Sequence, residues 1–209
     1  MTTEPMKYYY NPNSRAQITL WMLEEVQANY AIELIDFKKN DQKSPEFLKI
    51  NPMGKIPTLV HKGTVITEAA AICAYLADAF PNKKLAPPWD DPERGSYFRW
   101  LFFAAGCVEP AITDKVNPRR DEARASGLGY GSYASTMSTL EAAVTNKSFV
   151  CGNQFSAADV YVGSQIIWGL LFKTIPEREA FTKYVIPLKQ RSAYLKAEAI
   201  AAEYRGKLS

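Results

Sequence analysis

Residues 51–59 read NPMGKIPTL, and residues 67–69, TEA, follow at the start of an apolar run. Pro52 and Gly54 predict a turn, and a hydrophobic strand is expected at 58–61. Pro57 stands at the mouth of that strand, where a proline fits because it cannot donate to a sheet ladder. The sequence leaves the Ile56–Pro57 bond open between cis and trans. A cis bond would leave the backbone N–H and C=O of Ile56 facing outward, able to pair with an extended peptide.

Strand and helix patterns alternate on both sides of this stretch. Strands are expected at 6–10, 31–37, 58–61 and 64–66, and helices from 14, from 44 and over 68–80. Between the last two strands Lys62 and Gly63 give a two-residue hairpin signal. The order β-α-β-α-β-β-α is compatible with a small mixed sheet covered by helices.

A change of composition divides the chain. Residues 81–92, PNKKLAPPWDDP, contain four prolines and several charges, which is linker chemistry. Beyond them the strand patterns disappear and helical patterns continue to the C-terminus, with Pro110 expected to kink the first long helix. We therefore expect a first domain over residues 1–80, a linker over 81–92, and an all-α domain over 93–209.

Composition excludes several classes of function. The net charge of +3, without a dense Lys/Arg block, argues against nucleic acid, and no apolar run approaches the roughly 18 residues that a membrane span needs. The N-terminus lacks the pattern of a signal peptide. Three scattered cysteines indicate a reducing compartment, and a single histidine, His61, argues against a metal cluster. We expect a cytoplasmic protein that binds no metal.

The run from Ser44 to Leu59, SPEFLKINPMGKIPTL, followed by Glu68-Ala69-Ala70-Ala71-Ile72, resembles the glutathione-binding half of cytosolic glutathione transferases. The family pattern is N-P-x-G-x-[IV]-P-x-L and then E-S-x-A-I, and this chain departs from it at the serine, which is Ala69. The resemblance extends over nearly the whole chain. The chain is most similar to bacterial-type members of the family that resemble the serine-type theta, phi or beta-like classes. It implies a thioredoxin-like α/β domain followed by an all-helical domain, a homodimer, and glutathione as co-substrate.

The resemblance implies a group that activates the glutathione thiol. A free thiol titrates at about 8.5, and a hydrogen bond to the thiolate, worth about 1.5–3 kcal/mol, would lower that pKa by about one to two units. We rank Ser14 first, because it is the expected N-cap of the first helix and is followed by Arg15. Tyr10 and Asn11 are the alternatives, and Asn13 could also donate an amide N–H. A plain capping role for Ser14 remains open.

Other residues carry glutathione-binding roles by the resemblance. The γ-glutamyl carboxylate would sit on the first, unpaired N–H groups of a helix at Ala69, and Glu68 would hold the ammonium group. Ile56, beside Pro57, would pair with the cysteinyl backbone. Without the resemblance, Glu68 would be assigned as a first-turn glutamate that complements the helix dipole.

The glycyl carboxylate needs a cation. Gln42 and Lys43 resemble the pair that binds it in plant-type members, and Lys55 lies within reach along the chain. Lysines in such loops are also commonly just solvated.

The resemblance places an electrophile pocket against the second domain. The candidate lining residues, at helical spacing, are Tyr97, Trp100, Phe103, Cys107 and Trp168. An aromatic stripe of this kind is more often core than pocket.

The resemblance thus implies a glutathione S-transferase that adds the thiolate to small electrophiles, with reduction of hydroperoxides as a second activity. The alternative is a non-catalytic glutathione-binding, apolar-ligand-binding or interaction protein on the same fold, which the change to Ala69 motivates. Disulfide exchange of the glutaredoxin kind would need a cysteine in the first loop, and residues 11–15 contain none.

Overall fold

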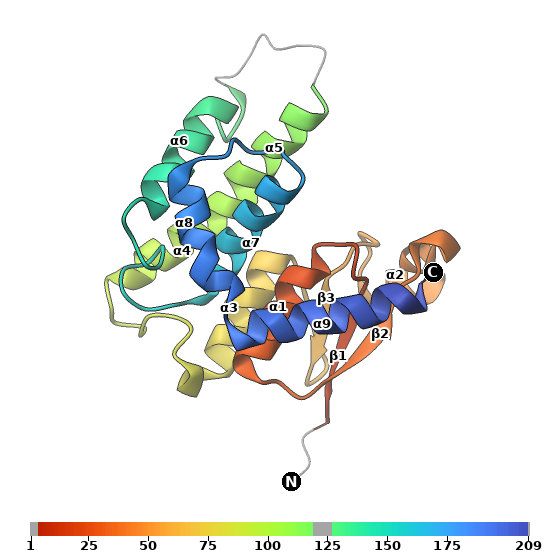
Figure 1. Cartoon of the computed structure of the whole chain (residues 1–209). Coiled ribbons are helices and arrows are strands. Elements are labelled where there is room, and N and C mark those ends of the chain that lie inside the picture. The colour runs from red at the N-terminus through yellow and green to blue at the C-terminus, as the bar shows by residue number, and fades with distance from the viewer. Residues whose placement is uncertain (1–3, 119–126, 209) are drawn as a thin grey trace. The chain divides into compact units, whose positions relative to one another are not determined.

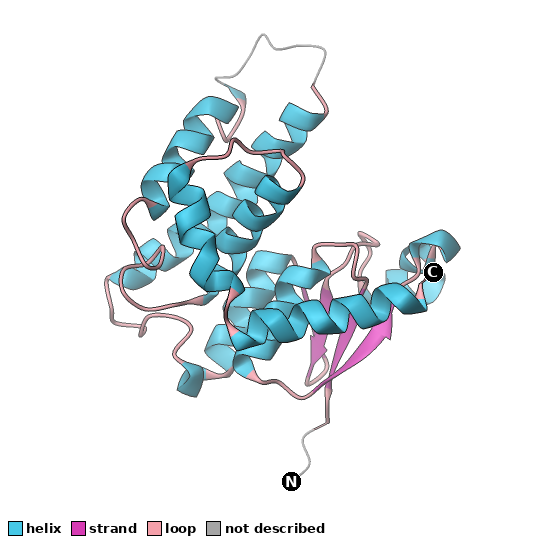
Figure 2. Cartoon of the chain, in the orientation of Figure 1, coloured by secondary structure: helices cyan, strands magenta, loops and turns pink. Residues whose placement is uncertain are grey.

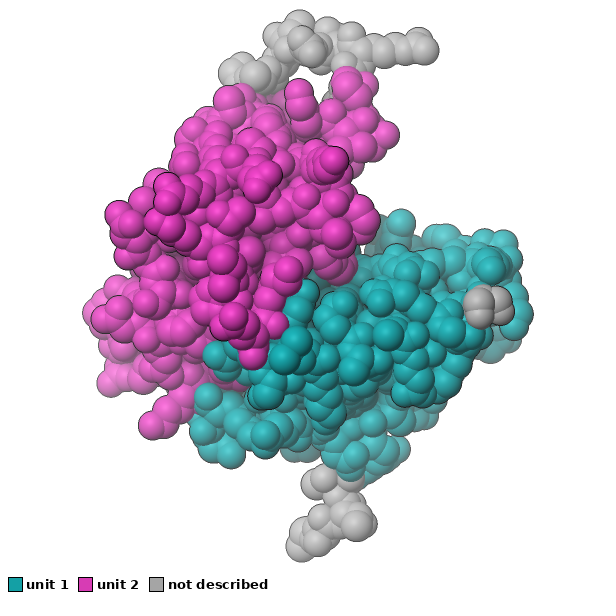
Figure 3. Space-filling view, viewed as in Figure 1, with its two compact units in different colours: residues 1–83, 191–209 teal, residues 84–190 magenta. Residues whose placement is uncertain are grey.

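The computed structural model describes residues 4–118 and 127–208, and it divides into two compact units. We call residues 1–83 with 191–209 the sheet unit, and residues 84–190 the helical unit; Figure 3 shows them in teal and magenta. The sheet unit is an α/β domain and the helical unit is all-α (Figure 2). This confirms the predicted fold class.

The sheet has four strands in the order β2-β1-β3-β4. They are β1 (Met6–Tyr10), β2 (Tyr30–Leu34), β3 (Thr58–His61) and β4 (Thr64–Thr67). β1 pairs parallel with β2 and antiparallel with β3, and β3 pairs antiparallel with β4. The turn between β3 and β4 has positive φ at both central residues, as a tight hairpin turn requires.

Helices of the sheet unit pack on this sheet and on one another (Figure 1). They are α1 (Ala16–Val26), α2 (Pro45–Ile50), α3 (Ala69–Ala79) and α9 (Ser192–Lys207), with 3-10 turns at Phe37–Lys39, Asp41–Lys43 and Pro81–Lys83. α1 is buried at ten of its eleven residues, because it contacts β1, α3 and α9 together. Ser44 caps α2 by accepting from the Phe47 N–H at 3.2 Å, as the sequence predicts.

The second strand is shorter than expected. We predicted 31–37, and β2 ends at Leu34. The Asp36 carboxylate accepts from the Lys38 N–H at 2.9 Å and so caps the 3-10 turn that follows. Aspartate competes with strand structure in this way because its side chain reaches its own backbone two residues on.

The C-terminal helix does not belong to the second domain as we drew it. Our boundary placed 93–209 together, whereas residues from 191 onward cluster with the sheet unit. Arg191 makes a bidentate pair with Glu25, at 2.6 and 2.8 Å, and the ring of Tyr194 meets Trp21 edge-on at 5.0 Å. These contacts tie α9 to α1, and a helical pattern alone does not reveal which partner a helix will find.

The helical unit is built around α7 (Ala157–Leu171), which is buried at twelve of its fifteen residues. The others are α4 (Glu93–Phe103), α5 (Glu109–Val116), α6 (Tyr133–Val144) and α8 (Glu179–Lys189). A π-helical turn, Ala104–Val108, separates α4 from α5 just before Pro110. The irregular turn falls where Pro110 lacks the N–H that a regular helix would use.

Within the described ranges, no helix is both long and apolar enough to cross a membrane, and no group of His, Cys, Asp or Glu could hold a metal ion.

Candidate functional site

The turn ahead of β3 is held by a buried asparagine. The Asn51 amide nitrogen donates to the Lys55 carbonyl at 2.8 Å and to the Thr58 hydroxyl at 3.1 Å, and its oxygen accepts from the Met53 N–H at 3.1 Å. Asn51 is only 4% exposed. One side chain therefore fixes the path of the backbone that carries Ile56. We did not single Asn51 out from the sequence, although its place at the start of the N-P-x-G run was the available signal.

Gly54 allows a close approach within this turn. Its φ is +60°, and a Cβ there would lie 2.6 Å from the Gln42 carbonyl oxygen and 2.7 Å from Lys43 Nζ. The Lys43 ammonium also donates to the Met53 carbonyl at 3.2 Å. The Gln42–Lys43 segment therefore packs directly against the turn.

The Ile56–Pro57 bond is cis. Ile56 is half-buried, and no hydrogen bond of its backbone N–H or C=O occurs among the residues that the structure describes. It lies just before β3, so it presents a donor and an acceptor beyond the last ladder pair, Thr58–Thr67. An extended peptide could use both groups.

Glu68 and Ala69 lie at the end of β4, where α3 begins. Glu68 is exposed and has φ +65° and ψ +118°, an unusual backbone conformation for a residue other than glycine. Such conformations concentrate at functional sites. In the described part of the chain, nothing accepts the Ala69 N–H, and the Glu68 carboxylate makes no hydrogen bond or ion pair. The start of α3 thus offers an N–H with a carboxylate beside it.

The sheet brings three segments together. Residues 56–57 and 68–69 flank the open end of the β3–β4 hairpin, because Thr58 pairs with Thr67. Tyr9 pairs with Thr58 on the other side, so β1 also ends at this edge and leads into the β1–α1 loop, residues 11–15. Most of the predicted glutathione-binding residues therefore gather at one edge of the sheet unit.

Two of the candidate thiol activators are engaged internally. The buried Tyr10 hydroxyl donates to Gln17 Oε1 at 2.6 Å, and burial raises the pKa of Tyr10 above its usual value. The buried Asn11 amide donates to the Ile35 carbonyl at 2.7 Å and accepts from the Asn13 N–H at 2.9 Å.

Ser14 is half-buried, and its hydroxyl donates to the Asn11 carbonyl at 2.8 Å. It also accepts from the Ala16 N–H at 3.1 Å. The N-cap position of α1 is Arg15, one residue later than we expected, and Arg15 and Asn13 are both exposed. The serine hydroxyl is thus close to the surface of the loop, next to the start of α1.

Around the turn, the predicted carboxylate-binding residues differ in exposure. Lys43 and Lys55 are exposed, and the Gln42 side-chain oxygen is buried without a hydrogen-bond partner among the described residues. Gln42 and Lys43 lie against the turn, as the Gly54 contact shows.

The electrophile candidates all lie in the helical unit. Tyr97 is fully buried and Trp100 is 6% exposed, so both are core residues. Phe103, Cys107 and Trp168 are half-buried, and Cys107 lies in the π-helical turn.

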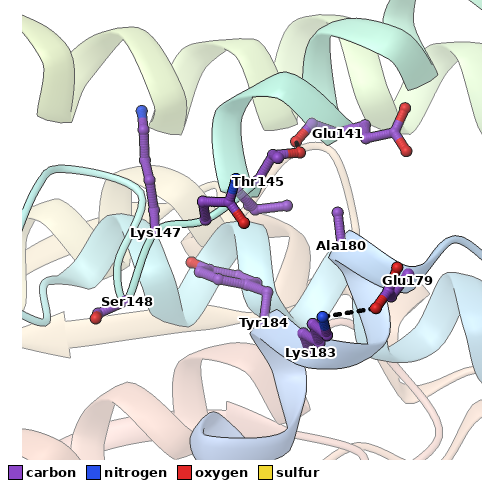
Figure 4. Close-up of a pocket in the computed structure, with 10 residues that line it drawn as sticks. Glu141, Thr145, Lys147, Ser148, Glu179, Ala180, Lys183 and Tyr184 are labelled. Carbon is purple, nitrogen blue, oxygen red and sulfur yellow. Dashed lines mark hydrogen bonds and ion pairs between the residues drawn. The ribbon is translucent and has the colours of Figure 1, made fainter.

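A hollow of about 460 Å³ in the helical unit lies elsewhere. It lies between the end of α6, the loop 145–148 and the start of α8 (Figure 4). Glu179 and Lys183 pair at its rim at 2.6 Å, and the Tyr184 hydroxyl is turned to Asp159 at 2.7 Å. None of the residues predicted for the site lines it.

Comparison with known proteins points to one family. The family model for the glutathione S-transferase N-terminal domain matches residues 4–78. Glutathione S-transferase GstA of Escherichia coli O157:H7 is 25% identical over 170 residues, which cover 80% of this chain and 84% of that protein.

Solved structures give the same result. A glutathione transferase from Methylococcus capsulatus matches with a TM-score of 0.78 at 26% identity, covering 94% of this chain and 98% of that one. The glutathione transferase URE2P8 from Phanerochaete chrysosporium, solved with oxidized glutathione, matches with a TM-score of 0.78 at 21% identity, covering 99% of both chains. At 21% identity the second likeness concerns the fold alone.

Proposed function

Because this chain belongs to the cytosolic glutathione transferase family, we propose that it binds glutathione at the open end of the β3–β4 hairpin and activates its thiol. The observation that carries the proposal is the pairing of two features at one edge. The backbone N–H and C=O of Ile56 have no partner in the described chain, and an uncapped helix start at Ala69 lies across the hairpin.

The peptide part of glutathione fits these groups. Its cysteinyl N–H and C=O pair with Ile56 next to Pro57, as an added strand residue would. Its γ-glutamyl carboxylate accepts from the Ala69 N–H at the positive end of α3, and its ammonium group pairs with Glu68.

The glycyl carboxylate is held from the turn side. The Lys43 ammonium donates to the carbonyl of Met53, which lies three residues before Ile56. Gln42 adds its amide and Lys55 a second cation; a carboxylate held by a cation at a partly exposed site gains about 0.2–1 kcal/mol.

Thiol activation is assigned to Ser14. Its hydroxyl would turn from the Asn11 carbonyl to the glutathione sulfur, and a hydrogen bond to the thiolate worth about 1.5–3 kcal/mol lowers the thiol pKa by about one to two units. The exposed Arg15 and the start of α1 add positive potential beside it. Tyr10 and Asn11 remain alternatives, but each would first have to give up the internal hydrogen bonds described above.

The proposed reaction joins the thiolate sulfur to an electrophilic carbon, while the thiol proton passes to solvent and the leaving group of that carbon, halide in an aryl halide, departs as an anion. Reduction of hydroperoxides is a second proposed activity, in which two glutathione thiols are oxidised to the disulfide and the hydroperoxide is reduced to alcohol and water. Contacts to the electrophile are assigned to Phe103, Cys107 and Trp168, the half-buried candidates. We also propose that the protein is a homodimer and that it acts in the cytoplasm.

Turnover of a model aryl halide with glutathione tests this proposal. We expect Ser14→Ala to lower kcat/KM roughly ten- to hundredfold, the size of one charged hydrogen bond, and Ser14→Thr to retain most activity. Full activity in Ser14→Ala would remove Ser14 from the mechanism and direct attention to Tyr10 and Asn11.

The second candidate is a glutathione-binding protein without chemistry, which the engaged Ser14 hydroxyl and the missing serine at Ala69 favour. Tight glutathione binding with an unshifted thiol pKa and no turnover would support it over the enzyme. Ala69→Ser restores the family hydroxyl, and we expect glutathione to bind roughly tenfold tighter, by calorimetry.

A further inference from the structure

Side-chain hydrogen bonds join the two ends of the β1–α1 loop: the Tyr8 hydroxyl donates to the Ala16 carbonyl, and Tyr10 bonds to Gln17. Tyr10 is the last residue before the loop, and Gln17 follows the first residue of α1. The Tyr10 hydroxyl donates to Gln17 Oε1 at 2.6 Å, and both residues are buried. The Gln17 backbone N–H also donates to the Ser14 carbonyl at 3.1 Å. Gln17 therefore bonds both to Tyr10, just before the loop, and to Ser14, within the loop.

The other half of the Gln17 amide is fixed by the C-terminal helix. Its Nε2 donates to the Ala197 carbonyl at 3.1 Å and to Glu198 Oε1 at 3.0 Å, both on α9. A second contact reaches the same place, because the ring of Tyr204 meets Tyr10 edge-on at 5.8 Å. Every polar atom of the Gln17 side chain therefore has a partner, and two of the three partners lie about 180 residues away along the chain.

We propose that Gln17 is a positioning residue that joins the C-terminal helix to the loop carrying Ser14, so that α9 sets the geometry of thiol activation. This rests on the proposed function, and its structural part can be tested without glutathione. A buried amide with all its hydrogen bonds made specifies one arrangement, and an unmade bond leaves a buried polar group that drives rearrangement. Loss of the Tyr10–Gln17 bond frees the base of the loop, and loss of the α9 bonds frees Gln17 itself.

Two variants probe the link, and one serves as the matched control. Gln17→Leu removes all three side-chain bonds of Gln17, and Tyr10→Phe removes only the Tyr10–Gln17 bond. Tyr30→Phe also removes a hydroxyl donor to a side chain of α1, Glu24, but away from the loop. Each is made in the full chain, with thermal unfolding recorded to show that it folds.

Amide hydrogen exchange of a peptide covering residues 11–16 measures the loop directly. We expect exchange to rise roughly tenfold in Tyr10→Phe and Gln17→Leu, and to stay within about twofold of wild type in Tyr30→Phe. The double variant Tyr10→Phe/Gln17→Leu should exchange no faster than Gln17→Leu alone, since both remove the same bond. Exchange equal to that of Tyr30→Phe in both single variants would overturn the proposal.

The pH profile then separates positioning from general loss of stability. With glutathione bound, Gln17→Leu should raise the thiol pKa toward its free value, while the dissociation constant measured near pH 5.5, where the thiol is protonated both free and bound, changes less than about threefold, because the anchoring groups lie on other segments. A larger dissociation constant with an unchanged thiol pKa would refute the proposed link between Gln17 and thiol activation. If wild type itself binds no glutathione, the proposed function fails, while the exchange experiment still decides whether Gln17 holds the loop.

Discussion

Gly54 and Gly63 both have positive φ, +60° and +79°, but their surroundings differ. A Cβ at Gly54 would overlap the Gln42 carbonyl at 2.6 Å, whereas a Cβ at Gly63 would meet nothing within 4 Å. The backbone penalty of alanine, about 1 kcal/mol, is common to both positions. Comparing alanine substitutions at Gly54 and Gly63 therefore isolates the free-energy cost of the steric overlap at Gly54, in the turn that carries Ile56.

We predict that Gly54→Ala lowers the free energy of unfolding by roughly 1–3 kcal/mol more than Gly63→Ala, because overpacking adds to the backbone penalty. Urea unfolding of the two variants measures the difference. We also expect Gly54→Ala alone to weaken glutathione binding, since Lys43 would be displaced. Equal losses in both variants would mean that the turn relaxes freely around the added methyl group.

Cysteine reactivity follows burial. Burial raises the pKa of the Cys73 thiol well above its usual value and that of Cys151 to about 12. The thiolate is the reactive form, so these two thiols stay protonated between pH 7 and pH 9 in the native chain. Cys107 is half-buried.

We predict that a thiol reagent at pH 8 modifies Cys107 in the native protein, and modifies Cys73 and Cys151 only after denaturation. Mass spectrometry of the modified peptides reports each site. Cys107→Ser should abolish native labelling. Labelling of Cys73 at the rate of Cys107 would show that α3 opens far more readily than its packing indicates.

At the scale of the element, the start of α7 depends on one buried carboxylate. Asp159 accepts from the Val150 N–H and the Tyr184 hydroxyl, both at 2.7 Å, and from the N–H and hydroxyl of Ser156, at 2.8 and 2.9 Å. It is 0% exposed. The sequence predicts a helix start here, with the serine and aspartate three residues apart. The links to Val150 and Tyr184 come only from tertiary structure.

Asp159→Asn places an amide nitrogen where two donors now point. We predict a loss of roughly 3 kcal/mol or more, because donors are left unsatisfied in the core. Circular dichroism during heating should show a lower Tm than for Asp90→Asn, an exposed change in the linker. A Tm equal to that of the control would show that water or a side-chain shift replaces the carboxylate.

At the scale of the whole molecule, the chain leaves the sheet unit at residue 83 and returns to it at residue 191. α9 supplies partners for buried groups of α1, including Lys196 for Glu24 at 2.6 Å and Arg191 for Glu25. A fragment ending at residue 83 would leave these carboxylates and the Trp21 ring uncovered. The apolar surface of α1 that α9 covers would then face water, at a cost of about 25 cal/mol per Å².

We therefore predict that residues 1–83 alone do not fold to a stable state, and that adding a peptide of residues 191–209 restores helical signal and a cooperative unfolding transition. A peptide with Arg191→Ala and Lys196→Ala should restore less. Cooperative unfolding of residues 1–83 alone, at the wild-type denaturant midpoint, would contradict the role of α9.

Local patterns in the sequence predict most of the sheet unit. Alternation and turn residues locate the four strands and the hairpin, and the serine–proline pair locates α2, because these signals act within a few residues. The place of α9 could not be predicted in this way, since it depends on contacts such as Gln17 with Ala197. The sequence also ranked Tyr10 and Asn11 as available donors, whereas in the structure Tyr10 donates to Gln17 and Asn11 donates to Ile35, bonds that form only once strand and helix pack together.

The most direct test observes the backbone amide of Ile56 itself, because the proposed contact is made by this amide and not by a side chain. In an amide nuclear magnetic resonance titration with S-methylglutathione, which lacks a reactive thiol, we predict a saturable shift of the Ile56 and Ala69 resonances. The Gly63 resonance, at the opposite end of the hairpin, should stay in place. Unmoved Ile56 and Ala69 resonances at millimolar ligand would contradict the central claim that this edge binds glutathione.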